Sequence, residues 1–373
     1  MIQKINLFSF KGTKMSGHHS CCTCSYNNYI GGYFLHSLPI SKFLMIRYIK
    51  DLALVEFIYK IYRLENEWER RYLLDMFFTP PIEYEPPVYR PPSEWRSLLI
   101  QLTIGCSNNK CTYCDMYRSK TYKVRPIQDI KADIAKCARA GMQPEKIFLC
   151  DGDALGAPMD ILEETLDCIH EFFPEVRRIG VYATAENILE KTSEQLKTLA
   201  QKKLTMAYLG LESGDDKILH MVVKGNTAQD MIEASLKIKE QGFKLSTIAM
   251  LGIGGKKYSE QHIRATAEVL SQTNPEYFSF LTTFAIPGTP YHRMVERGLI
   301  EPLTSKELLI EMHDILEQST FDLNKVIFRA NHVSNAKPIG GILPQDKAQI
   351  LETLKLWIKQ TPAGVYPKMP ASM

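Results

Sequence analysis

Residues 98–114 read Leu98-Leu99-Ile100-Gln101-Leu102-Thr103-Ile104-Gly105-Cys106-Ser107-Asn108-Asn109-Lys110-Cys111-Thr112-Tyr113-Cys114. The first seven residues are mostly apolar or β-branched and end at a glycine, which predicts a buried strand. The next nine residues contain three cysteines, Cys106, Cys111 and Cys114, which predicts a thiol-bearing loop. The sequence therefore predicts a strand with three thiols at its carboxyl end.

Strand and helix patterns alternate after this stretch. We expect five further strands, at residues 146–150, 178–184, 206–212, 245–251 and 277–284. Helices are expected between them, near residues 127–140, 162–173, 194–203, 227–241 and 260–272. Since a parallel strand is reached only through a crossover, these six βα units predict an α/β fold with a parallel sheet. An open, partial barrel and a doubly wound sheet both fit, and each places its working site at the carboxyl ends of the strands.

The chain divides into three predicted parts. Residues 1–92 form an N-terminal extension, irregular and then helical, which ends in a linker or ordered strap with three proline pairs between Pro80 and Pro92. Residues 93–300 contain the βα units. Residues 301–373 form a mostly helical C-terminal appendage, with helices near 305–319 and 345–359 and a short strand at 326–328.

The composition is that of a globular protein. Of 373 residues, 45% are hydrophobic and 23% are charged, which excludes a disordered or fibrous chain. The net charge of +3 provides no broad basic field and argues against a nucleic-acid partner. Nine unevenly spaced cysteines do not form the disulfide framework of a small secreted protein. Because we find no secretory signal, and because charges interrupt the apolar residues 43–62, we expect a cytoplasmic protein without a transmembrane segment.

The three cysteines of the loop are spaced as metal ligands. Thiolates at this spacing can converge on one soft metal centre, either zinc or iron–sulfur. A structural zinc site closes with four ligands, and the next Cys or His after Cys114 is Cys137, inside a predicted helix. Three ligands leave one position open for substrate or cofactor, which favours a catalytic centre, and a structural zinc loop stays as the alternative.

Residues 95–300 resemble the radical S-adenosylmethionine (SAM) enzymes, a superfamily of partial (βα)6 barrels. The resemblance implies that Cys106, Cys111 and Cys114 are the metal ligands and catalytic residues that hold a 4Fe-4S cluster, whose unique iron S-adenosylmethionine chelates. It also implies that Tyr113 packs near the adenine, since the family usually has an aromatic residue there. The first interval, Cys-x4-Cys, is one residue longer than the commonest family spacing.

Two more strand ends resemble cofactor contacts of this superfamily. Asp151 and Asp153 follow the second strand, where the resemblance implies a turn that holds the methionine amino group; a plain turn is the alternative. Glu212 lies in the segment Gly-Leu-Glu-Ser-Gly at 210–214, which looks like the branch of methylthiotransferases, coproporphyrinogen oxidases and elongator-like proteins. The resemblance implies that Glu212 faces the ribose or the methionine of the cofactor.

Three later segments complete the candidate site. Gly252 follows the fifth strand in a glycine-rich segment, and Ile286 follows the sixth, where the family uses backbone groups against the adenine. A plain loop fits both positions equally. The last segment contains Arg329, Asn331, His332 and Asn335. These residues are candidates for substrate contacts at the barrel mouth, and a capped turn is the alternative.

The resemblance implies an enzyme that reductively cleaves S-adenosylmethionine to a 5′-deoxyadenosyl radical, which acts on an unidentified substrate. It also implies an external electron donor such as ferredoxin or flavodoxin. No cysteine follows Cys168, which excludes a C-terminal auxiliary cluster. We expect the run His18 to Cys24 to be a disordered extension or an adventitious metal site. The competing hypothesis is a zinc- or cluster-binding scaffold module without radical chemistry.

Overall fold

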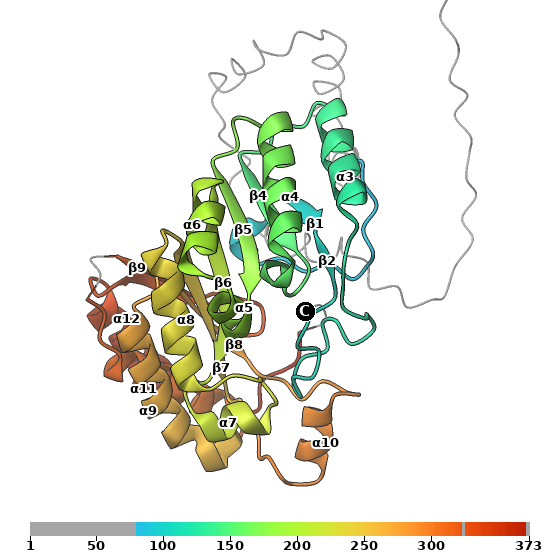
Figure 1. Ribbon diagram of the computed structural model, residues 1–373. Helices are drawn as coiled ribbons and strands as arrows, with labels where there is room; N and C mark the ends of the chain where they lie inside the picture. The colour runs from blue at the N-terminus through green and yellow to red at the C-terminus, as the bar shows by residue number, and fades with distance from the viewer. Residues whose placement is uncertain (1–79, 323–324, 371–373) are drawn as a thin grey trace, which may run out of the picture.

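A computed structural model describes residues 80–322 and 325–370 (Figure 1). The run from His18 to Cys24, the apolar stretch at 43–62 and the helices expected before residue 79 lie outside the described residues. Within the described part of the chain, no helix is long and apolar enough to cross a membrane.

One eight-stranded sheet organises the molecule. Its strands lie side by side in the order β1 (Leu98–Gln101), β4 (Lys146–Cys150), β5 (Arg178–Ala183), β6 (Leu204–Glu212), β7 (Lys244–Leu251), β8 (Tyr277–Thr282), β9 (Val326–Ala330) and β10 (Ile339–Leu343). All neighbours from β1 to β9 are parallel, and β10 is antiparallel to β9. In this sheet β1 and β10 are the two edges. The sheet is thus an open barrel that winds in one direction, which confirms the predicted partial barrel; a doubly wound sheet would reverse its strand order.

The sheet continues beyond the six predicted strands. β9 pairs in parallel with β8, where Phe278 lies opposite Phe328, and β10 forms the final edge. The short strand expected in the C-terminal appendage is therefore the seventh parallel strand of the main sheet. The domain boundary at residue 300 stays a prediction.

The first predicted strand is divided in two. β1 stays in the main sheet, while β2 (Thr103–Ile104) turns away and pairs antiparallel with β3 (Lys123–Val124). This two-stranded ribbon holds the two ends of the cysteine loop together.

Most of the helices lie along the outer side of the sheet, while α10 lies apart from it (Figure 1). The helices are α3 (Ile127–Arg139), α4 (Met159–Phe172), α5 (Ala185–Glu190), α6 (Ser193–Gln201), α7 (Asp216–Met221), α8 (Ala228–Glu240), α9 (Gly255–Thr273), α10 (Pro290–Glu296), α11 (Ser305–Gln318) and α12 (Lys347–Gln360), with short 3-10 turns η3 (Pro92–Glu94) and η4 (Ala154–Gly156). Capping boxes start α6, α8 and α11 at Thr192, Thr227 and Thr304, so these starts are encoded locally.

Residues 80–97, which we call the strap, cover part of the inner face of the sheet. Tyr84 and Val88 pack against the inner-face cluster of Leu99, Phe148, Cys150, Met206 and Tyr208. The Tyr84 hydroxyl donates to the carbonyl of Leu99 at 2.9 Å. The buried carboxylate of Glu94 accepts a hydrogen bond from the Tyr208 hydroxyl at 2.5 Å. The proline-rich segment is thus an ordered part of the interior.

The loop after β6 lies directly against α9. The backbone N–H of Gly214 donates to Thr266 Oγ1 at 3.0 Å, and Ser213 Oγ lies 2.9 Å from His262 Nδ1. A Cβ on Gly214 would overlap the carbonyl oxygen of Ala265 in α9. Only glycine therefore allows this loop and α9 to approach so closely.

A buried carboxylate joins α11 to the end of β7. Glu311 Oε2 accepts from the backbone N–H of Gly252 at 2.5 Å, and Oε1 accepts from Ser259 Oγ at 2.7 Å. Burial raises the pKa of Glu311 to about 7, from an ordinary value of 4.5. The C-terminal segment is thereby fixed to the carboxyl edge of the sheet.

Gly214→Ala tests the contact between the β6 loop and α9. We expect the free energy of unfolding to fall by about 3 kcal/mol, because overpacking forces backbone movement. Gly242→Ala is the matched control, since Gly242 has φ +92° but no atom within 4 Å of an added Cβ; it should cost about 1 kcal/mol for the left-handed backbone alone. Urea unfolding of both variants measures the difference. Equal losses would contradict the packing argument.

Glu311→Gln tests the buried carboxylate. The folded state holds the Glu311 proton more tightly than the unfolded chain does. The contribution of this protonated group to the free energy of unfolding is therefore fully present below pH 4.5 and is lost as the pH rises through about 7. Glutamine keeps an acceptor oxygen for Gly252 and does not ionise. We expect the stability of the variant, relative to the native chain, to rise by about 3 kcal/mol between pH 4.5 and 8, measured by urea unfolding at both values. A difference that is independent of pH would show that Glu311 stays ionised.

Candidate functional site

The cysteine loop is tied to two other loops at the carboxyl edge of the sheet. The N–H of Thr112 donates to the carbonyl of Val222 at 2.9 Å, and the carbonyl of Thr112 accepts from the N–H of Tyr291 at 3.1 Å. Val222 follows α7, and Tyr291 belongs to α10. The structure thus brings the predicted ligands next to the segments that follow β6 and β8.

Side chains within the loop fix its backbone. Asn109 Nδ2 donates to the carbonyls of Tyr117 and Lys120 at 2.7 and 3.1 Å. Arg118 Nε donates to the carbonyl of Cys114 at 2.6 Å. Asn108 Nδ2 donates to the sulfur of Cys111 at 3.4 Å. These bonds give the loop a defined shape although it has no regular structure of its own.

All three thiols of the loop are free and half-buried. Burial and the nearby Asp153 raise the pKa of Cys106 to about 12, and burial raises that of Cys114 to about 11. The thiols are therefore protonated at neutral pH. Soft metal centres bind the thiolate form, so a metal centre bound here would displace the thiol protons.

The number of thiols on the loop bears on the class of metal centre. Cys106, Cys111 and Cys114 offer three thiolate ligands. A structural zinc site closes with four protein ligands, whereas three thiolates leave one position of a metal centre open. The donor set therefore fits a centre with one position open to a cofactor or substrate.

Asp151 supports the loop from below. Its buried carboxylate accepts from Lys120 Nζ at 2.7 Å, from the N–H of Gly105 at 2.9 Å, and from Gln101 Nε2 at 3.1 Å. Lys120 also donates to the carbonyls of Glu85 and Pro87 in the strap. The carboxylate of Asp151 is thus hydrogen-bonded to other residues of the protein.

Asp153, two residues later, has an unused oxygen. Its Oδ2 accepts from Ser107 Oγ and from Asn187 Nδ2, while the buried Oδ1 has no partner among the described residues. The hydroxyl of Tyr122 is likewise buried without a partner there. Burial raises the pKa of Asp153 to about 6, so the carboxylate is ionised at neutral pH. An unpaired buried carboxylate oxygen beside the thiols fits the amino group of a ligand such as S-adenosylmethionine.

Glu212 forms an ion pair with Lys224 at 2.9 Å, and both side chains are largely buried. A Cβ on Gly210 would overlap Glu212 Oε1 and lie 3.0 Å from Lys224 Nζ, so this pair requires glycine at position 210. Burial alone would lower the pKa of Lys224. Glu212 and Cys111 have the larger combined effect, so the pKa of Lys224 is raised overall. Burial and Glu212 both raise the pKa of Tyr113. Glu212, Tyr113, Lys224 and Cys111 therefore form one group.

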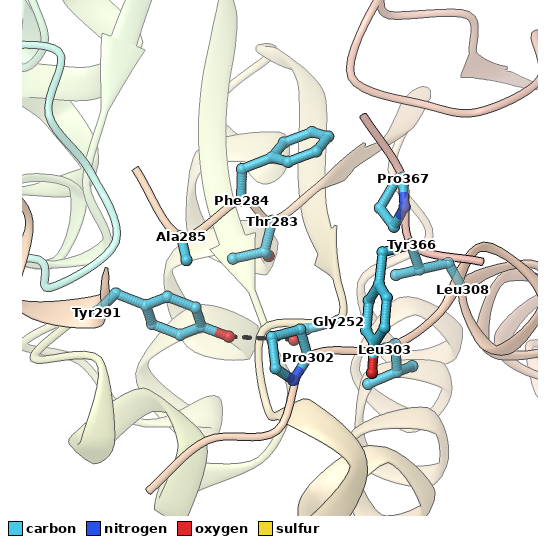
Figure 2. Close-up of a pocket in the computed structure, with 10 residues that line it drawn as sticks. All are labelled: Gly252, Thr283, Phe284, Ala285, Tyr291, Pro302, Leu303, Leu308, Tyr366 and Pro367. Atoms are coloured by element: carbon cyan, nitrogen blue, oxygen red, sulfur yellow. Dashed lines mark hydrogen bonds between the residues drawn. The ribbon is translucent and has the colours of Figure 1, made fainter. Parts of the chain in front are cut away.

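Gly252 directly follows β7 and lines a cavity of about 90 Å³, whereas Ile286, four residues after the end of β8, is not among its lining residues. Gly252 has φ +77°, and its carbonyl accepts from the Tyr291 hydroxyl at 3.2 Å (Figure 2). The N–H of Ile286 donates to the carbonyl of Phe284 at 3.0 Å, and its carbonyl accepts from the N–H of Thr289 at 3.1 Å. Figure 2 shows Tyr366 of the C-terminal segment on the opposite side of this cavity.

The polar run after β9 has two different roles. Asn335 caps the end of β8, because its Nδ2 donates to the carbonyl of Phe280 at 2.7 Å and its Oδ1 accepts from Thr282 Oγ1 at 3.0 Å. Arg329 and Asn331 are exposed, and His332 is half-buried. The alternative of a capped turn therefore applies to Asn335. Arg329 and His332 stay candidates for substrate contacts.

Sequence reasoning missed three residues of this site. Lys224 follows the short α7, Tyr122 lies just before β3, and Glu311 belongs to a helix far along the chain. No motif marks them, since each acts through a partner distant in sequence. The glycine at position 210 was the one local signal that something lies close to Glu212.

Part of the chain is similar to known proteins. Residues 100–270 match the model of the Radical SAM superfamily. The chain is 20% identical over 215 residues to the heme chaperone HemW of Bacillus subtilis (strain 168), and the match covers 55% of each protein. It is 26% identical over 232 residues to a tRNA-2-methylthio-N(6)-dimethylallyladenosine synthase of Mannheimia succiniciproducens, covering 58% of this chain and 47% of that protein. The chain thus spans about half the length of these relatives.

A solved structure is also similar. Coproporphyrinogen III oxidase (HemN) from Escherichia coli, described as a radical SAM enzyme, superposes with a TM-score of 0.42 at 14% identity, over 71% of this chain and 52% of that chain. The family match begins in β1 and includes the cysteine loop and the strand ends up to β7. The chain thus contains, at residues 100–270, a domain that matches the Radical SAM superfamily.

Proposed function

We propose that this protein is a radical SAM enzyme that binds a 4Fe-4S cluster and S-adenosylmethionine and acts on a substrate not yet identified. One observation carries the proposal. Three free thiols lie on one loop at the carboxyl edge of an open barrel, where they offer three ligands and leave one position of a metal centre open. The family match over residues 100–270 supports it.

The chain's own residues divide the work. Cys106, Cys111 and Cys114 hold the cluster, and a bound cluster supplies the electron that cleaves S-adenosylmethionine to methionine and a 5′-deoxyadenosyl radical. Tyr113 packs beside the adenine. Asp153 accepts the methionine amino group through its free Oδ1.

Three further residues complete the cofactor site in this proposal. Glu212, oriented by Lys224, faces the ribose or the methionine. Gly252 and Ile286 border the cofactor at the ends of β7 and β8. Asp151, predicted as a cofactor contact, acts instead as a positioning residue, because Lys120, Gly105 and Gln101 use its carboxylate.

The proposed reaction sets the partners. It needs one electron from outside the chain, and a ferredoxin or flavodoxin is the expected donor, as radical SAM enzymes generally need an external one. A reducing cytoplasm suits free thiols and an oxygen-sensitive cluster. The near-balanced charge argues against a nucleic-acid substrate. The zinc-scaffold alternative is less well supported, since a structural zinc site needs a fourth ligand and the loop offers three thiols.

Replacing each loop cysteine by alanine tests the ligand set. After anaerobic reconstitution, we expect the native chain to bind about four irons and Cys106→Ala, Cys111→Ala or Cys114→Ala to bind far fewer, because each loses one thiolate. Release of 5′-deoxyadenosine, with reductant and S-adenosylmethionine, should fall at least tenfold. Cys168→Ala, which removes a buried free thiol from α4, is the control and should keep both. Stoichiometric zinc with no iron in the native chain would support the scaffold instead.

The variants Asp153→Asn and Asp151→Asn distinguish a residue that binds S-adenosylmethionine from one that positions the cysteine loop. Asp153→Asn should weaken S-adenosylmethionine binding about 10- to 100-fold with iron content unchanged, because one charge-assisted hydrogen bond is lost. Asp151→Asn should lower the free energy of unfolding by about 3 kcal/mol or more, because Lys120 keeps a buried, unpaired charge. Equilibrium dialysis of the ligand and urea unfolding measure the two effects. A loss of affinity in the Asp151 variant at full stability would reverse the assignment.

A further inference from the structure

The inner face of the sheet is covered at one end by the strap and is less covered at the other. On β7, β8 and β9, Ala249, Phe280 and Phe328 point to the outer, helix-covered side of the sheet and are fully buried. The residues that alternate with them are half-exposed: Ile248, Met250, Tyr277, Ser279, Leu281 and Ile327. The described residues therefore leave a largely apolar inner surface, which we call the β7–β9 face.

Two cations lie on this side of the sheet, Lys244 at the amino end of β7 and Arg329 on β9. Arg329 is opposite Ser279 in the β8–β9 register and therefore shares its side of the sheet. Its side chain is exposed, and Nη1 donates to the carbonyls of Phe328 and Gly341 at 2.7 and 3.3 Å. Across residues 80–322 and 325–370, no Asp or Glu forms an ion pair with it. These backbone bonds fix the guanidinium and leave its remaining donors for a ligand.

The carboxylate near this face is already neutralised. Glu212, at the carboxyl end of β6, is paired with Lys224. The inner β-strand positions on β7, β8 and β9 add no acidic residue. The face therefore combines apolar surface with positive charge, of which Arg329 lies beside the apolar residues of β8, and this complements a ligand of apolar body and negative head group.

A second donor follows β9. His332 Nδ1 accepts from the N–H of Ser334 at 3.2 Å and lies 2.8 Å from Ser334 Oγ. The proton of the neutral imidazole is then on Nε2. Ser334 Oγ also accepts from the N–H of Thr282, so this loop lies at the carboxyl end of β8. His332 is thus a neutral hydrogen-bond donor close to the end of the β7–β9 face.

We propose that the β7–β9 face binds an apolar molecule with an anionic head group, a carboxylate or a phosphate, and that Arg329 binds this group. Guanidinium matches both oxyanions through paired N–H donors. Both Arg329 and His332 lie outside the residues that match the family model. That this molecule is the substrate rests on the proposed function; that the face binds it does not.

The test is equilibrium dialysis of the full chain, without cluster or S-adenosylmethionine, against three probes with one apolar body. Phenylbutyrate and phenylbutyl phosphate supply the two anions, and phenylbutylamine supplies the opposite charge. We expect one of the anions to bind at least tenfold more tightly than the amine. Arg329→Gln should weaken that binding about 10- to 100-fold.

Arg177→Gln is the matched control, because Arg177 is an exposed arginine next to the amino end of β5 and pairs only loosely with Glu145 at 3.8 Å. It should leave binding unchanged. A urea midpoint for Arg329→Gln equal to the native value excludes a folding defect, and Arg329→Lys should restore part of the affinity. Equal binding of anion and amine, no effect of Arg329→Gln, or no binding of any probe at millimolar concentration would overturn the proposal.

The same probes separate this proposal from the radical SAM function. Arg329-dependent binding in a chain that releases no 5′-deoxyadenosine would uphold the anion site and remove its role as a substrate site. Release of 5′-deoxyadenosine without Arg329-dependent binding would uphold the enzyme and reject the anion site.

Discussion

The buried ion pair between Lys120 and Asp151 is the constraint on which the rest of the site depends. Its atoms lie 2.7 Å apart and belong to two segments that sequence alone separates by 31 residues. The Lys120 ammonium also donates hydrogen bonds to two carbonyls of the strap. The Asp151 carboxylate also accepts one from the N–H of Gly105, at the start of the cysteine loop. A buried charge is tolerated only when its partners are complete, so strap, loop and β4 must be in place together.

The sequence predicted the parts whose signals are local. Apolar runs located the strands, and close cysteine spacing located the loop. It did not divide residues 98–104 into β1 and β2, because the turn toward β3 depends on pairing with residues 123–124, which are distant in the sequence. Nor did it add β9 to the sheet, since a short strand does not reveal which edge it pairs with.

The roles of the two aspartates show a further limit. Asp151 and Asp153 are equivalent in sequence, two residues apart after one strand. The structure separates them because Lys120 reaches one and not the other, and because Asn187 comes from a helix after the next strand. Contacts of this kind are set by packing, and no pattern in the surrounding residues encodes them.

The strap has a consequence for the evolution of the pocket. Proline fixes its backbone angle before folding, so ordering a proline-rich segment loses less conformational entropy than ordering an ordinary one. Part of the interior is thus covered by a peptide and not by additional strands. Because Lys120 donates to the carbonyls of Glu85 and Pro87, insertions or deletions that displace these carbonyls would also disturb the cysteine loop, so the cover of the interior and the loop would have to evolve together.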